Sequence, residues 1–102
     1  MNGSAFRYDF GADVPMEEVQ ASILLAMLGC ESLHGETDVH LNTTYTLDAA
    51  KRSCVVDVSN DVGRDLNRLF AGFLRREFGR GQFSVKRVDS VARSMPPLSS
   101  NN

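Results

Sequence analysis

The sequence predicts an α+β fold on the ferredoxin-like βαββαβ plan. The predicted fold is a four-stranded antiparallel sheet in the order 4-1-3-2 with two helices on one face. Hydrophobic and polar residues alternate, as is typical of strands, in four short stretches at residues 6–10, 39–47, 53–59 and 83–88. Hydrophobic residues recur three or four positions apart, as is typical of helices, in two longer stretches at 16–34 and 61–79. The order of these stretches along the chain gives the topology.

The first strand and helix are delimited by local signals. Aromatic and charged residues alternate over residues 6–10, so the aromatic side chains are expected to face the core. Asp13 and Pro15 then mark the start of a helix, because a carboxylate can cap free amides and proline is tolerated in a first turn. Gly35 after His34 is a typical helix end.

The helix over residues 16–34 is more hydrophobic than a surface helix needs to be. Leu24, Leu25 and Leu28 widen its hydrophobic stripe well beyond one face. Either the strands and a neighbouring helix together cover this surface, or a second subunit does. Gly29 in the helix interior predicts a close approach of another element, because glycine is otherwise unfavourable there.

The next two strands, at 39–47 and 53–59, are close enough to form an antiparallel hairpin. A register with Leu47 opposite Arg52 and Tyr45 opposite Cys54 leaves one face of the hairpin hydrophobic. The helix over 61–79 follows a cap at residues 59–61 and is expected to bury Phe70 and Phe73. Residues 1–88 thus form a single predicted domain, and the polar residues 89–102 form a predicted disordered tail.

Composition indicates an ordinary globular chain. The net charge of −2 conceals an asymmetry: residues 1–50 carry one basic and eight acidic residues, and residues 51–102 carry ten basic and five acidic ones. Such polarity favours head-to-tail contacts or an anionic partner for the basic half. The sequence contains no membrane-spanning run and no recognisable secretory signal, so a cytoplasmic protein is expected. Cys30 and Cys54 are expected to be reduced core residues, and no cofactor is expected.

The open face of the sheet supplies one candidate site. By alternation it collects a polar cluster, which comprises Asp9, His40, Asn42, Asp57 and Lys86. Carboxylates beside an imidazole can hold a divalent ion or transfer protons, which would suit a metal-dependent hydrolase. The simpler interpretation is a solvated charged face, because such residues are common on exposed sheets. Base stacking by RNA is disfavoured, because the central strands present no aromatic residue on this face.

Two further candidate sites lie elsewhere. The small-residue loop Gly11, Ala12 and Asp13 matches what small-molecule-sensing regulatory (ACT-like) domains of this topology require, by analogy of fold only. Three arginines align on the outward face of the second helix, namely Arg64, Arg68 and Arg75. They suit a nucleic-acid backbone or an acidic partner, although local pairing with preceding aspartates is the simpler interpretation, and nucleic acid is not the expected partner.

No catalytic motif is present, so the leading hypothesis is a small non-enzymatic domain that self-associates or contacts another protein. A metabolite-sensing domain that binds its ligand at a subunit interface near residues 11–13 is the alternative. A metal-dependent hydrolase that uses the open-face cluster is the third.

Overall fold

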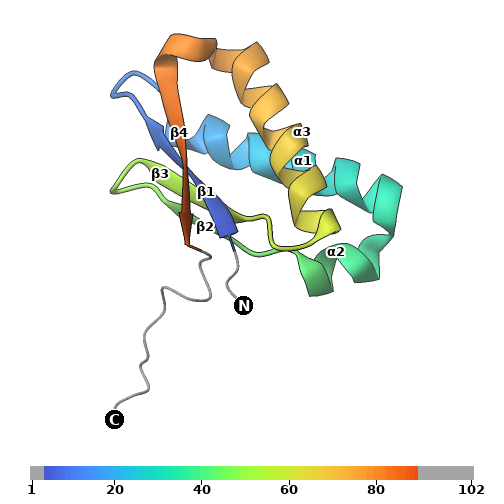
Figure 1. Ribbon diagram of the computed structural model, residues 1–102. Coiled ribbons are helices and arrows are strands. Elements are labelled where there is room, and N and C mark those ends of the chain that lie inside the picture. The colour runs from blue at the N-terminus through green and yellow to red at the C-terminus, as the bar shows by residue number, and fades with distance from the viewer. Residues whose placement is uncertain (1–3, 90–102) are drawn as a thin grey trace.

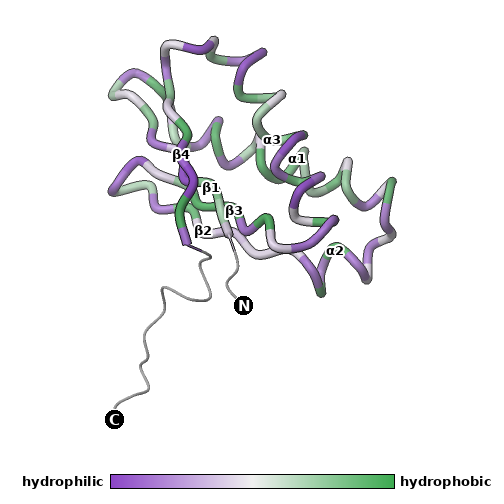
Figure 2. Tube along the Cα trace, in the orientation of Figure 1, coloured by the Kyte–Doolittle hydropathy of each residue, from purple (hydrophilic) through white to green (hydrophobic). Residues whose placement is uncertain are grey.

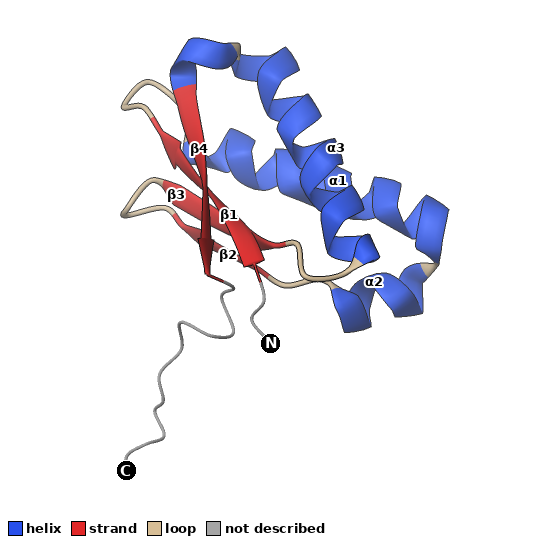
Figure 3. Ribbon diagram, in the orientation of Figure 1, coloured by secondary structure: helices blue, strands red, loops and turns tan. Residues whose placement is uncertain are grey.

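The structure, a computed structural model, describes residues 4–89 of the 102-residue chain. Four antiparallel strands form one sheet in the order β2-β3-β1-β4, and the same order read from the opposite edge is 4-1-3-2. The long helices α1 and α3 lie together on one face of this sheet (Figures 1 and 3). The elements are β1 Ser4–Phe10, α1 Met16–His34, α2 Glu36–Asn42, β2 Tyr45–Asp48, β3 Ser53–Asp57, α3 Asp61–Phe78, the short 3-10 helix η1 Arg80–Gln82 and β4 Phe83–Asp89.

The prediction of a strand over residues 39–47 is wrong in its first half. Residues Glu36–Asn42 form a third helix, α2, and the strand begins only at Tyr45. Val39 and Leu41 are two positions apart, which fits a strand face, but only Val39 is buried, whereas Leu41 is 75% exposed. The hydroxyl of Thr43 donates to the Val39 carbonyl at 2.6 Å and closes this helix. One buried residue in two turns is therefore all that α2 contributes to the core.

The hairpin register differs from the predicted one by two residues. Tyr45 pairs with Val56 and Leu47 pairs with Cys54, and β3 ends at Asp57. Successive side chains alternate between the faces of a strand, so a shift of two leaves the same residues facing the helices. Cys54 and Val56 are accordingly fully buried, as their hydrophobic face requires.

The core lies between the sheet and the two long helices. The buried hydrophobic residues of β1, β3, α1 and α3 form one cluster, to which α2 adds Val39. Phe70 is fully buried and Phe73 packs against the cluster half-buried. A Cβ atom added at Gly29 would lie 3.0 Å from the Leu69 Cδ1 atom, so the predicted close approach is confirmed and is made by α3.

The ends of α3 follow the predicted signals. The Asn60 side chain accepts a hydrogen bond from the Gly63 amide at 2.8 Å, which caps the first turn. Gly79 ends the helix with a φ of 79°, a conformation that favours glycine. Hydrophobic and hydrophilic residues alternate over the first half of the next strand, β4, and two hydrophilic residues, Lys86 and Arg87, then follow each other (Figure 2). The strand extends to Asp89, so the first residue of the predicted disordered tail is ordered, and residues 90–102 lie outside the described part.

Candidate functional site

The predicted open-face cluster does not form. Asp9, Asp57 and Lys86 lie on strands of the sheet, but His40 and Asn42 belong to α2 and are not on that face. Asp57 pairs with Ala5 across the sheet, so it is four positions along β1 from Asp9, a separation of about 13 Å. The geometry on which the hydrolase hypothesis depended is therefore absent.

The members of that cluster have other neighbours. Asp9 forms an ion pair with Arg7 at 3.0 Å, and the His40 Nε2 atom is 3.9 Å from the Glu36 carboxylate one turn earlier. Across residues 4–89, no group of three or more histidine, cysteine or acidic side chains is arranged to hold a metal ion.

The loop of Gly11, Ala12 and Asp13 lies exposed between β1 and α1. The Gly11 amide donates to the Gln82 carbonyl at 2.9 Å, and the Gly11 carbonyl accepts from the Arg52 guanidinium at 2.6 and 3.1 Å. A shallow hollow of about 330 Å³ reaches Gly11 but not the other two residues. Ligand binding at this loop stays a prediction, and the backbone of Gly11 already has partners within the chain.

The two cysteines are free thiols and both are fully buried, as predicted. Burial raises the pKa of Cys54 to about 12. The pKa of Cys30 is also raised, mainly by burial and to a smaller extent by the negative charge of the Asp65 carboxylate. Cys30 and His34 are one turn apart on α1, but His34 pairs with Asp65 at 2.8 Å while the Cys30 thiol contacts the Val62 carbonyl at 3.9 Å. Neither cysteine is therefore in an environment that would favour a reactive thiolate.

The arginines of α3 are exposed and partly paired, as the sequence predicted. Arg64 forms an ion pair with Asp61, and the Arg68 Nη1 atom is 3.7 Å from Asp65. Local pairing of this kind contributes little at an exposed helix surface.

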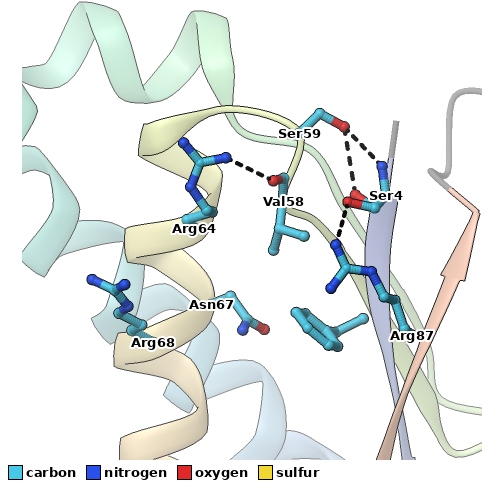
Figure 4. Close-up of a pocket in the computed structure, with 8 residues that line it drawn as sticks. Ser4, Val58, Ser59, Arg64, Asn67, Arg68 and Arg87 are labelled. Atoms are coloured by element: carbon cyan, nitrogen blue, oxygen red, sulfur yellow. Dashed lines mark hydrogen bonds between the residues drawn. The ribbon is translucent and has the colours of Figure 1, made fainter. Parts of the chain in front are cut away.

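Two of these arginines line a cavity of about 350 Å³ between α3 and the edge of the sheet (Figure 4). Arg64 and Arg68 contribute from α3, and Arg87 contributes from β4, whereas Arg75 is not among the lining residues. Arg87 pairs with Phe6 across β1 and β4, on the side of the sheet that faces the helices. The sequence contains a signal for it, because Arg87 is in phase with Phe83 and Val85 along the strand.

A hydrophobic surface remains on α1, defined by Leu24, Leu25 and Leu28 and called the leucine surface below. These side chains are 49%, 56% and 60% exposed. At about 100° per residue they lie opposite the buried stripe of the same helix, which comprises Val19, Ile23, Ala26 and Cys30. No element of the described chain covers them, so the first of the two predicted explanations for this helix, coverage by strands and a neighbouring helix, is wrong.

Comparison with known proteins found no matching family model, no similar curated protein and no similar solved structure. Within the described residues, no helix combines the length and the hydrophobicity needed to cross a membrane.

Proposed function

We propose that this protein is a non-enzymatic self-association domain in which two copies pair through their α1 helices. The observation that carries the proposal is the leucine surface, three adjacent half-exposed leucines on the side of α1 that points away from the core. Single exposed leucines are normal on soluble proteins, but a contiguous hydrophobic patch marks an interaction site.

The charges around the leucine surface favour a second copy of this chain as the occupant. Glu17 and Glu18 lie in the first turn of α1, at one end of the leucine surface. In an antiparallel pair the glutamates of the two copies lie at opposite ends of the contact, and the helix dipoles also oppose each other favourably. Such an isologous two-fold contact matches one hydrophobic surface with an identical one, and two-fold dimers are the commonest oligomers.

We expect a weak dimer, with a dissociation constant in the micromolar range. Stable interfaces bury about 800 Å² on each partner. Three partly exposed leucines supply only part of such an area, so the rest of the buried area has to come from the residues of α1 that surround them.

The test is the mass of the protein in solution between low and high micromolar concentrations, measured by sedimentation equilibrium. The wild type is expected to approach the dimer mass. Leu28→Lys is expected to raise the dissociation constant at least about tenfold, because it places two like charges in the hydrophobic contact. Leu41→Lys is the matched control, because Leu41 is more exposed than Leu28 but lies on α2. We expect this substitution to leave dimerisation unchanged.

A mixing experiment tests the two-fold geometry itself. Leu28→Lys and Leu28→Glu are each expected to dimerise more weakly than the wild type when alone, and to form a mixed dimer when combined, because the two substituted positions lie near each other across the axis. A wild-type protein that stays monomeric at several hundred micromolar overturns the proposal. Equal effects of the Leu28 and Leu41 substitutions on the dissociation constant also overturn it, because the interface could then not be assigned to α1.

A further inference from the structure

The cavity between α3 and β4 is lined by positive charge. Three of the side chains that line it are arginines, and none is acidic. Figure 4 shows Arg64 and Arg68 on successive turns of α3 and Arg87 on β4 on the other side of the cavity. The Arg68 side chain points away from the other labelled residues, so it lies at the rim of the cavity. The cavity of about 350 Å³ lies at the small end of the range for ligand pockets, so it suits a small molecule better than a macromolecule.

Of the three arginines that line the cavity, Arg87 is the one without a carboxylate partner. Its Nη2 atom donates to the Ser4 hydroxyl at 3.2 Å, and its guanidinium carbon lies 5.4 Å from the centre of the Phe6 ring. Among the residues that the structure describes, no carboxylate lies within ion-pair distance of it. The aromatic ring thus orients a guanidinium whose charge has no anionic partner.

The two arginines of α3 have partners within the chain but do not use all of their donors. Arg64 is shared between Asp61 and the Val58 carbonyl, which lies 3.4 Å away. Arg68 is 79% exposed, and its Nη1 atom lies 3.7 Å from Oδ1 of Asp65, whose Oδ2 atom pairs with His34 at 2.8 Å. Both guanidiniums therefore retain donors that a bound anion can use.

The remaining lining residues supply neutral donors and a hydrophobic wall. Asn67 accepts the Tyr8 hydroxyl through its Oδ1 atom at 2.5 Å, so its Nδ2 amide is the group left to donate toward a ligand. Ser4 and Ser59 place hydroxyls at one end of the cavity, and Phe6 and Val58 line it with hydrophobic surface.

We propose that this cavity binds a small phosphate monoester, with the phosphate between Arg64 and Arg87, Arg68 at the rim, and the organic group against Phe6. A carboxylate occupies one guanidinium fork, whereas a phosphate dianion presents three charged oxygens and can engage arginines from two sides. The proposal is independent of the α1 pairing, because the cavity involves no residue of α1.

The test is a titration of the ¹⁵N-labelled full chain, followed by NMR at low ionic strength, with phenyl phosphate, inorganic phosphate and benzoate as probes. Phenyl phosphate is expected to shift the amide signals of Ser4, Ser59 and Asn67 and to bind more tightly than benzoate. Arg87→Gln is expected to weaken it at least about tenfold, because each charge-assisted contact is among the stronger hydrogen bonds. Arg68→Gln is expected to act in the same direction.

Arg75→Gln is the matched control, because Arg75 is an exposed arginine of the same helix outside the cavity, and it is expected to change the affinity less than about twofold. Tighter binding of phenyl phosphate than of inorganic phosphate supports an organic monoester, and equal binding of the two overturns the role of Phe6. Three other results overturn the proposal: no shifts with either phosphate, benzoate binding as tightly, or equal weakening by the Arg75 and Arg87 substitutions. Thermal unfolding without ligand shows whether each variant is folded.

Discussion

The hydroxyl of Tyr8 donates to the Oδ1 atom of Asn67 at 2.5 Å, which joins the fully buried centre of β1 to the side of α3 that lines the arginine cavity. The Tyr8 ring also packs edge-on against Phe70, with 4.9 Å between ring centres. Tyr8 thus packs in the core through its ring and orients the side-chain amide of Asn67 through its hydroxyl.

Tyr8→Phe tests this connection, because it removes the hydroxyl and keeps the ring. We expect a loss of about 1–3 kcal/mol of stability in urea unfolding, since Asn67 is left with an unsatisfied, partly buried acceptor. Tyr45→Phe is the control: the described residues offer its hydroxyl no hydrogen bond and its ring is half-buried, so we expect a change within about 0.5 kcal/mol. Equal losses in the two variants would contradict the assigned role of the hydrogen bond.

Gly63 and Gly72 both lie in α3 and are expected to respond oppositely to alanine. A Cβ at Gly63 would lie 2.3 Å from the Asp57 carbonyl oxygen, which is backbone and cannot move aside cheaply. Gly63→Ala should therefore cost at least about 2 kcal/mol. Around Gly72 no atom lies within 4 Å of the added Cβ, so Gly72→Ala should stabilise the protein by about 0.5–1 kcal/mol through helix propensity.

Thermal unfolding of the two variants measures these effects directly. A stabilising Gly63→Ala substitution would mean that the start of α3 does not pack against the end of β3 as described. A destabilising Gly72→Ala substitution would mean that this side of α3 is covered.

The sequence predicts the long elements well because their patterns span several turns. The ranges of α1 and α3, the Asn60 cap and the glycine ends all depend on local chemistry that acts within one helix. The prediction fails at 36–44 because Val39 and Leu41 fit a strand spacing, while the helix there is held by a single buried residue and by contacts with α1 and α3. Short segments of this kind are decided by tertiary packing rather than by pattern.

The cavity could not be predicted because its parts are far apart in the chain. Arg68 is a candidate from its place on a helix face, but its association with Ser4 and Arg87 depends on the register of β1 and β4. The leucine surface, in contrast, is visible in the sequence as excess hydrophobicity. Only the structure determines which residues of α1 face away from the core.

Arg52 is the residue expected to hold the two loops at one end of the sheet together. Its guanidinium donates to the carbonyls of Gly11 and Val14, and its backbone has a φ of 54°. Arg52→Ala removes these charge-assisted bonds and retains the unusual backbone conformation, so we expect a loss of about 1.5–3 kcal/mol in urea unfolding. Lys51→Ala, at the exposed neighbouring position, is expected to change stability by less than about 0.5 kcal/mol. A similar effect of both substitutions would show that the guanidinium bonds do not stabilise the loops.

The buried thiol of Cys54 is expected to make stability depend on pH in the alkaline range. Burial raises its pKa to about 12 in the folded state, whereas an unfolded cysteine ionises near about 8.5. The stabilising contribution is therefore complete below about pH 8.5 and is lost as the pH rises toward the folded value, because only the unfolded chain releases the proton in this interval.

Urea unfolding of the wild type and of Cys54→Ala between about pH 8 and 11 isolates this contribution, since the other titrating groups are common to both proteins. Alanine costs packing energy at every pH, but we expect the difference between the two proteins to narrow by up to about 1.4 kcal/mol per pH unit above pH 9. A difference that stays constant over the whole range would mean that Cys54 is hydrated in the folded state. Rapid reaction of the native thiol with a disulfide reagent at pH 8 would lead to the same conclusion.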